Sequence, residues 1–346
     1  MSRKKGRGLL AAAAAVLVVA AGMTAVFYAL NSPSPEIPAE GKIFAVRPGE
    51  TLGDIAARLE QEGLVRSALF LQSVARLSGK QGSYKSGYFR LLPGDSTLDV
   101  QDLLVSGYQE QVKVTIPEGW TLKKIASHLE AKGVSTRAEV QAAAADPALL
   151  ARLKVPAENL EGYLFPDTYF FPAGYPAEAI VEQMALNFFD RLSELDPEAS
   201  RLAAGELHEK VILASIVERE YRLEKEAPLI ASVFVNRLGK NIGLESCATL
   251  EYIITDLLDR PHPRYLSEED KRIRSPYNTY LWAGMPPGPI SNPGRVALAA
   301  ALHPARTAFY YFVLKDGQTG QHYFSDSLQQ HNWAKYYYLK QVGAGG

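Results

Sequence analysis

The sequence has one cysteine, few histidines and almost no net charge. Its single cysteine, Cys247, excludes an internal disulfide and any CxxC-type metal site. The six histidines are scattered and form no HExxH motif, so we expect neither a metal nor another cofactor. The 37 Lys and Arg residues balance 38 Asp and Glu residues, which leaves no overall basic excess for nucleic-acid binding. Apolar residues make up 47% of the 346, so the chain is globular, and its length fits two domains with additional segments.

One long apolar run lies near the N-terminus. Residues 9–30 carry no charge and would span about 33 Å as a helix, enough to cross the roughly 30 Å core of a bilayer. Four basic residues precede the run, and the positive-inside rule keeps that end in the cytoplasm. A cleaved signal peptide is the first alternative, because the run is rich in alanine, although the run is longer than a usual signal sequence. A buried helix of a soluble protein is the second.

The anchor interpretation fixes the expected location of the remaining chain. It gives a cytoplasmic tail at 1–8, a single-pass transmembrane helix at 9–30 and a Pro-rich linker at 31–42. Residues from about 31 onward then lie outside the cytoplasmic (inner) membrane, in the periplasm.

An internal repeat follows the linker. The matching residues, 70 positions apart, are Thr51, Leu52, Ile55, Ala56, Leu59, Glu60 and Gly63 in the first copy and Thr121, Leu122, Ile125, Ala126, Leu129, Glu130 and Gly133 in the second. In each copy the threonine is a candidate N-cap, the apolar residues share one helix face, and the glycine suits the left-handed position that ends a helix. A weaker third copy starts at Pro93. Alternating strands are expected before the two main copies.

This strand–turn–helix unit resembles the LysM-like module, a small βααβ fold associated with glycan binding. The stretch at 48–56 carries the best match. Two interpretations stay open for the region 43–155, namely contact with glycan and a packed spacer that sets the distance from the membrane.

The chemistry is expected in the second half of the chain. Residues 211–217 carry no charge, and Glu218 follows them on the same helical face as Val211 and Ala214. Desolvation, and the negative end of the helix dipole if the helix ends soon afterwards, would both raise the pKa of Glu218, as a general acid requires. The alternative is a surface ion pair between Glu218 and Arg222, one helical turn later. Glu220 is expected to face solvent.

In several motifs the chain resembles the endolytic murein transglycosylases, the YceG-like or MltG family. The motifs that carry the resemblance lie at residues 161–169, 212–220, 231–238, 275–280 and 284–294. The family usually has glutamine, aspartate and proline where this chain has Glu245, Cys247 and Ala248. The resemblance covers nearly the whole chain and implies an α+β protein: an N-terminal transmembrane helix, a LysM-like βααβ region and a mixed α/β catalytic domain at 156–346.

The resemblance also implies an activity. Family members cleave the β-1,4 bond between N-acetylmuramic acid and N-acetylglucosamine in nascent peptidoglycan strands, leave a 1,6-anhydro end and terminate strand elongation. The partners would be peptidoglycan glycan strands and a peptidoglycan synthase. The family's catalytic glutamate corresponds to Glu218, which is expected to line an elongated cleft.

Amide, carboxyl and hydroxyl side chains near these motifs are candidates for binding the sugar. They are Asn236, Glu245, Tyr277, Asn278, Thr279 and Tyr280. For the asparagines and tyrosines, turn capping and core filling are the alternatives.

Two other functions remain open. A muramidase-type hydrolase would use a second carboxylate, from Glu245, Glu220 or Asp167, beside Glu218. A non-catalytic tether would only bind peptidoglycan.

Overall fold

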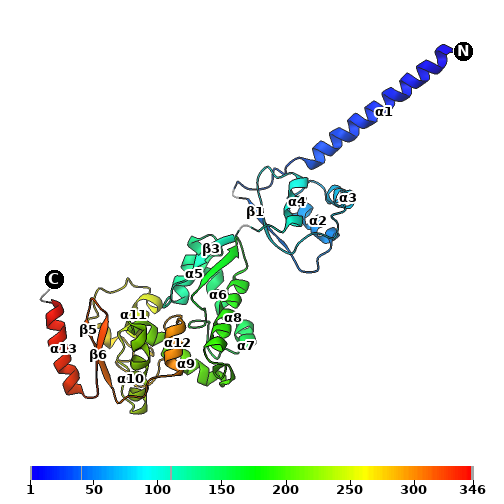
Figure 1. Ribbon diagram of the computed structural model, residues 1–346. Coiled ribbons are helices and arrows are strands. Elements are labelled where there is room, and N and C mark those ends of the chain that lie inside the picture. Colours follow the sequence, from blue (N-terminus) through cyan, green and yellow to red (C-terminus); the bar gives the residue numbers. More distant parts are fainter. Residues whose placement is uncertain (1, 40, 110, 344–346) are drawn as a thin grey trace. The chain divides into compact units, whose positions relative to one another are not determined.

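The computed structural model describes residues 2–39, 41–109 and 111–343, and the chain divides into two compact units (Figure 1). Unit 1 comprises Met1–Val112 and Pro172–Gly174, and unit 2 comprises Lys113–Phe171 and Tyr175–Gly346. The boundary between them lies inside the range 43–155, so the two main repeat copies belong to different units. The described residues form a mixed α/β protein with three two-stranded sheets.

Unit 1 contains one sheet and its covering helices. Its elements are α1 (Ser2–Asn31), β1 (Lys42–Val46), α2 (Leu52–Gln61), α3 (Ala68–Leu77), β2 (Gly87–Leu91) and α4 (Thr97–Ser106). Strands β1 and β2 pair antiparallel with Phe44 opposite Phe89, and both rings are buried in the core of the unit. The order β1–α2–α3–β2 is the βααβ order expected of the first repeat copy.

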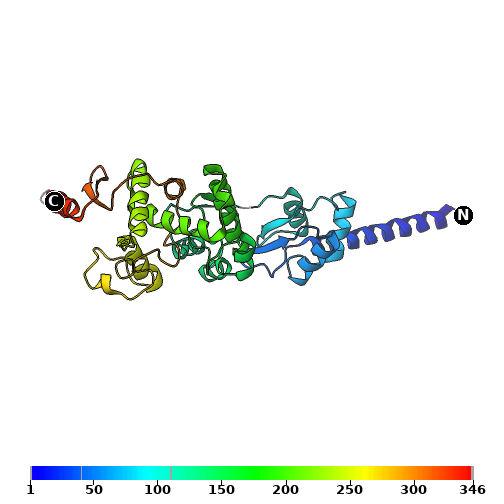
Figure 2. The same ribbon diagram turned by 90° about the horizontal axis from the view of Figure 1, so that it is seen from below.

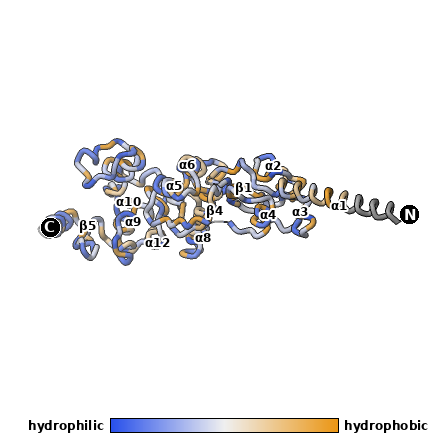
Figure 3. Tube along the Cα trace, turned by 90° about the horizontal axis from the view of Figure 1, so that it is seen from above, coloured by the Kyte–Doolittle hydropathy of each residue, from blue (hydrophilic) through white to orange (hydrophobic). Residues whose placement is uncertain are grey.

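Helix α1 is long and apolar enough to cross a membrane over Ala14–Asn31, and none of that stretch is buried inside the protein. Figure 3 colours the trace by hydropathy and shows hydrophobic residues in this part of α1. Its C-terminal end is joined to α4: Thr97 Oγ1 donates a hydrogen bond to the Leu30 carbonyl, 3.0 Å away, and Asn31 Oδ1 accepts one from the Leu98 amide at 3.0 Å. The Pro-rich segment that follows packs on unit 1, with Ile37 buried in the core. The basic side chains expected in the cytoplasmic tail lie outside the described side chains.

The helix ends of both repeat copies form as the sequence predicts. The hydroxyl of Thr51 caps α2 and that of Thr121 caps α5 (Leu122–Ala131), each accepting a hydrogen bond from the amide three residues later. Gly63 and Gly133 follow these helices with φ of 68° and 69°, in the left-handed region that favours glycine. The third, weaker copy gives only the capped helix α4.

Unit 2 contains two more sheets among its helices. The remaining elements are β3 (Gln111–Thr115), α6 (Arg137–Ala144), α7 (Pro147–Leu153), β4 (Thr168–Pro172), α8 (Ala177–Leu195), α9 (Ala204–Glu220), α10 (Ala227–Gly239), α11 (Cys247–Tyr252), α12 (Arg295–Leu302), β5 (Tyr311–Asp316), β6 (Gln321–Ser325) and α13 (Leu328–Gly343). Strand β3 pairs with β4, and β5 pairs antiparallel with β6.

Helix α9 lies in the centre of unit 2. It packs against α10, α11 and α12 (Figure 2). Every residue from Val211 to Val217 is buried, including the polar Ser215, because neighbouring helices and loops cover all sides of this stretch. The uncharged run of the sequence is therefore a buried helix, and it holds the residues that follow it in a fixed place.

Candidate active site

Glu218 lies in the last turn of α9, directly after the buried stretch. The helix ends at Glu220, so Arg222 is not on the next turn of the same helix, and the predicted surface pair with Glu218 does not form. Burial raises the pKa of Glu218 to about 7, and the nearby Glu118 carboxyl adds to the increase. The raised pKa expected from the sequence is confirmed. Near neutral pH this carboxyl group holds a proton that it can donate.

The Glu218 carboxyl group faces the start of α12. The Gly294 amide donates a hydrogen bond to Glu218 Oε2 at 2.9 Å. Gly294 is the N-cap of α12, and the partial positive charge of a helix N-terminus favours a carboxylate. This contact stabilises the ionised form of Glu218 and opposes the effect of burial, so both protonation states are accessible.

Hydrogen bonds to α9 fix the loop that carries Gly294. Ser215 Oγ accepts a hydrogen bond from the Ile290 amide at 3.0 Å, and Ser291 Oγ donates one to the Ser215 carbonyl at 3.0 Å. The hydroxyl in the otherwise apolar run thus has a structural function, because it ties the loop to the helix one turn before Glu218.

Asn292 joins this loop to two other segments. Its Nδ2 donates to the Trp120 carbonyl and to Glu161 Oε1, both at 2.9 Å, and its Oδ1 accepts from the Leu164 amide at 2.8 Å. The side chain is fully buried. Its own backbone also pairs with the turn at Gly119 and Trp120. The Pro-Glu-Gly turn of the second repeat copy is thereby held against the loop that contacts Glu218.

Glu118, on that turn, brings a second carboxyl group near Glu218. The residue as a whole is exposed, but partial burial of its carboxyl group raises its pKa, and the charge of Glu224 adds to the increase. A Cβ atom placed on Gly119 would lie 3.5 Å from Glu218 Cγ, which shows how closely the turn approaches the acid.

The prediction that Glu220 faces solvent is wrong. Its Oε1 accepts a hydrogen bond from Ser246 Oγ at 2.5 Å, and burial raises its pKa. Glu220 does not lie on the apolar face of the helix, but the 244–247 loop covers the side on which it lies. Helical periodicity alone does not reveal this cover.

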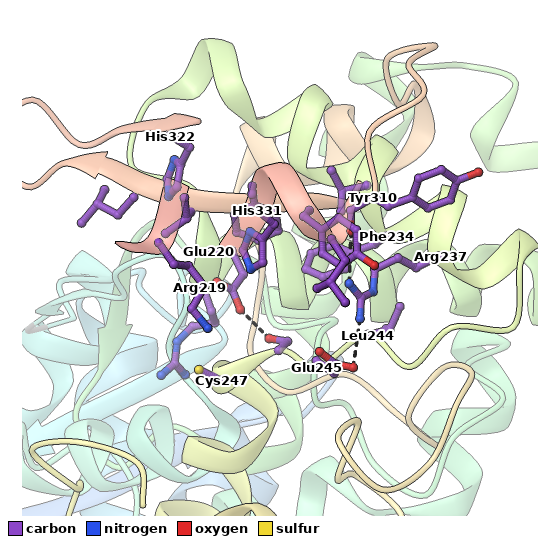
Figure 4. A pocket seen from close by; sticks show the side chains of 18 of the residues that line it. Arg219, Glu220, Phe234, Arg237, Leu244, Glu245, Cys247, Tyr310, His322 and His331 are labelled. Carbon is purple, nitrogen blue, oxygen red and sulfur yellow. Dashed lines mark hydrogen bonds and ion pairs between the residues drawn. The ribbon is translucent and has the colours of Figure 1, made fainter. Parts of the chain in front are cut away.

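A cavity of about 460 Å³ lies beside the end of α9 (Figure 4). Arg219, Glu220, Arg237 and Glu245 are among its lining residues, and strands β5 and β6 and helix α13 contribute further residues to the wall. Glu218 is not among the described residues that line it. Successive residues of a helix point about 100° apart, so Arg219 and Glu220 face this cavity while Glu218 faces Gly294.

Two of the predicted sugar-binding residues are buried. Asn278 is fully buried and donates to the carbonyls of Lys271, at 3.0 Å, and Ile273, at 2.8 Å. Thr279 Oγ1 accepts from the Ser246 amide at 3.1 Å. These side chains hold the 271–281 loop and the 244–247 loop in place, and neither is available to a ligand in this structure.

The other candidates lie in different places. Asn236, on α10, donates to the carbonyls of Thr307 and Phe309, both at 2.9 Å. Glu245 is 54% exposed and forms an ion pair with Arg237 at 3.2 Å in the cavity.

The two tyrosines pack against side chains of α11. Tyr277 lies against the ring of Tyr252, with 5.2 Å between ring centroids, and the Tyr280 hydroxyl is 3.2 Å from Cys247 Sγ. Asp167, the remaining candidate for a second carboxylate, is held by Asn187 and Arg191.

Sequence reasoning missed three residues around Glu218. Glu118, Glu161 and Asn292 all belong to stretches that the sequence analysis singled out, as the second repeat copy or as motifs. One sequence signal could have pointed to Glu118. The two repeat copies differ at this position of the turn, where the first copy has Pro48 and the second has Glu118.

Comparisons with known proteins agree with this architecture. A profile of the YceG-like family matches residues 44–336. An endolytic murein transglycosylase of Bacillus subtilis is 29% identical over 307 residues, covering 84% of this chain and 83% of that protein. One from Streptococcus pneumoniae D39 is 30% identical, covering 91% of this chain, which spans 62% of the streptococcal protein's length.

A solved structure is also similar. The crystal structure of a yceG-like protein from Listeria monocytogenes has a TM-score of 0.56 and 29% identity, covering 86% of this chain and 99% of the other. The family match extends over both units and includes Glu218, Glu118 and Gly294. On these grounds, this chain belongs to the YceG-like family.

Proposed function

We propose that this protein is a lytic transglycosylase that cleaves peptidoglycan glycan strands from within, with Glu218 as the single acid and base. The observation that carries the proposal is a half-buried carboxyl group with a pKa of about 7 in a chain of this family. The bond cleaved would be the β-1,4 bond from N-acetylmuramic acid to N-acetylglucosamine. Cleavage in nascent strands would end their elongation, next to a peptidoglycan synthase.

The first half of the reaction needs a proton donor. Protonated Glu218 gives its proton to the glycosidic oxygen as the C1–O bond breaks, and the leaving sugar departs with a new hydroxyl group. The carboxylate that remains accepts the Gly294 hydrogen bond at the N-terminus of α12, which stabilises its negative charge at this step.

The second half needs a base. The Glu218 carboxylate takes the proton from the C6 hydroxyl of the muramic acid residue, whose oxygen bonds to C1 and closes the 1,6-anhydro ring. Because this nucleophile belongs to the substrate, its effective concentration is high and no bound water is required. Glu218 ends protonated and ready for the next cycle.

We also propose that α1 anchors the protein in the cytoplasmic membrane with unit 2 outside. The support is an apolar stretch, Ala14–Asn31, that is not buried by the rest of the chain, preceded by basic residues in the sequence. Unit 1 joins this helix through α4 and would hold the glycan or act as a spacer.

The test is digestion of uncrosslinked glycan by the full chain followed by mass spectrometry. Wild type is expected to produce 1,6-anhydro ends, and Glu218→Gln to cut at least about 100-fold more slowly, the usual contribution of a general acid. Glu209→Gln, an exposed glutamate on the same helix, is the matched control and should cut at the wild-type rate.

The products distinguish the possible functions. Ends that carry one added water would show a muramidase-type hydrolase instead. Equal behaviour of wild type and Glu218→Gln, with glycan bound but uncut, would leave only a binding protein.

A further inference from the structure

The two repeat copies use their turns differently. In the first copy Glu50 follows the Pro-Gly turn and forms an ion pair with Arg58 at 2.6 Å. The equivalent positions in the second copy are Trp120 and His128, whose rings contact edge to face at 5.2 Å between centroids. The second copy therefore stabilises its turn and helix with an aromatic pair. Its glutamate stands two positions earlier, at 118, and is not used in that pair.

Glu118 has no hydrogen-bond or ion-pair partner within the part of the chain that the structure describes, although it is held close to Glu218. A Cβ atom placed on Gly294 would lie 1.8 Å from Glu118 Oε1, and the Gly294 amide contacts Glu218 Oε2 at 2.9 Å. Given standard bond lengths, the two carboxyl oxygens lie within about 7 Å of each other, on either side of Gly294. This is close enough for one charge to influence the other, and within the range over which paired carboxyl groups act in glycosidases.

We propose that Glu118 is the second carboxyl group of this site and that its negative charge keeps the proton on Glu218 until a glycan strand arrives. Glu118 acts as a positioning residue through Glu218. The second repeat copy would thus belong to the catalytic apparatus, because its turn places the Glu118 carboxylate near Glu218.

The difference in exposure between the two carboxyl groups indicates which of them is protonated. Glu218 is half-buried and Glu118 is exposed, so in a pair that shares one proton the ionised member is Glu118. The raised pKa of both groups is consistent with this arrangement.

Other charged and titratable groups near the pair are few. Arg219, on α9, lowers the pKa of Glu218, and it is itself paired with Glu251 at 2.8 Å. Glu224, in the short helix Glu224–Glu226, acts on Glu118. Burial raises the pKa of the Tyr221 hydroxyl, and the charges of the same three carboxyl groups add to the increase. Removing Glu118 is thus expected to change Glu218 more than removing Glu224 does.

The proposal rests on the proposed function for its first test, the pH dependence of glycan cleavage by the full chain. In Glu118→Gln the negative neighbour is lost, so Glu218 gives up its proton more readily. The alkaline limb of the profile should move to lower pH by about 0.5 to 1.5 units, the Coulomb effect of one charge at about 7 Å. Activity at pH 5 to 5.5 should fall less than activity at pH 7 to 8, and Glu118→Asp, which keeps the charge, should return most of the alkaline limb to its wild-type position.

Gly294→Ala provides an independent variant that keeps Glu118. Gly294 has φ of −85°, which any residue adopts, and the three atoms nearest to the added methyl group all belong to the flexible side chain of Glu118. The fold should be preserved while that carboxyl group is pushed away, so the alkaline limb should again move to lower pH. The first-copy variant Glu50→Gln is the matched control and should leave the limb in place.

Two results would overturn the proposal. One is a Glu118→Gln profile whose alkaline limb coincides with that of wild type. The other is an equal loss of activity at every pH, which Glu118→Asp does not rescue, because that pattern belongs to a structural role.

A second measurement separates this proposal from the proposed function. The carbon-13 signal of the Glu218 carboxyl group, assigned with Glu218→Gln, can be titrated by NMR in the detergent-solubilised full chain. It should titrate at lower pH in Glu118→Gln than in wild type, even if neither protein cuts glycan. If Glu218 titrates at the same pH in both proteins, the proposed effect of Glu118 on Glu218 is refuted, whether or not the protein cleaves glycan.

Discussion

Glu161 is a buried acid that the reaction does not use directly. It is 6% exposed, and both carboxyl oxygens lie 3.0 Å from the Leu122 amide at the start of α5. Desolvation raises its pKa to about 8 despite these contacts. The folded protein therefore holds a proton here that the unfolded chain releases near pH 4.5.

This residue predicts a pH-dependent stability. Because the folded state binds the extra proton, the free energy of unfolding should fall as the pH rises from about 4.5 to 8, by up to about 1.4 kcal/mol per pH unit. Glu218 adds to this decrease up to pH 7. Glu161→Gln, which is neutral at every pH, should unfold with a clearly smaller dependence on pH.

All three tryptophans, Trp120, Trp282 and Trp333, belong to unit 2, so denaturant titration followed by tryptophan fluorescence reports on that unit. A Glu161→Gln protein with the wild-type slope between pH 5 and 8 would show that Glu161 is ionised in the folded state.

At the scale of elements, the helix caps of the two repeat copies give a paired prediction. Thr121→Ala removes the N-cap of α5 and the hydrogen bond from its hydroxyl to Asp256, so unit 2 should lose about 1 to 2 kcal/mol of stability. The tryptophan-monitored transition should shift accordingly. Cleavage should also slow, because the turn that carries Glu118 leads directly into α5.

Thr51→Ala makes the same chemical change in unit 1. It removes the N-cap of α2, so the far-ultraviolet circular dichroism transition should shift while the tryptophan transition stays in place. Loss of cleavage in Thr51→Ala equal to that in Thr121→Ala would contradict the assignment of only the second copy to the catalytic site.

Local features of the fold could be predicted from the sequence, because their causes lie within a few residues. The caps at Thr51 and Thr121 and the left-handed glycines form as expected. Each of these depends on propensity, periodicity or turn chemistry over one or two helical turns.

The surroundings of Glu218 could not be predicted in the same way. Its main partner, Gly294, is 76 residues away, and Asn292 joins segments that are 128 to 172 residues distant from it. The solvent-facing prediction for Glu220 is wrong for the same reason, since Ser246 contacts this side chain from another loop. The sequence could single out Glu218 as a candidate because an apolar run precedes it, but the groups that adjust its pKa are brought there by tertiary packing.

At the scale of the whole molecule, the two units share a repeat but differ in what they carry. The copy in unit 1 is joined to α1 through α4, and the copy in unit 2 is joined through Asn292 to the loop that contacts Glu218. In the proposed arrangement, the copy in unit 1 would lie on the membrane side and the copy in unit 2 on the substrate side. This division requires α1 to lie in the membrane and unit 2 to lie outside the cell's inner membrane.

The single cysteine allows that topology to be tested without altering the protein. Cys247 is exposed and lies in unit 2. If unit 2 is outside, a membrane-impermeant maleimide should label Cys247 at the same rate in intact spheroplasts and after lysis. Burial raises the pKa of the thiol, so labelling should be slow in both cases and is best compared as a rate.

Cys247→Ser is the control and should take up no label, because the chain has no other cysteine. Resistance of the labelled protein to carbonate extraction would distinguish an intact anchor from a cleaved signal peptide, since only the anchored form stays with the membrane. Labelling that appears only after lysis would place unit 2 in the cytoplasm, where no glycan strand could reach Glu218.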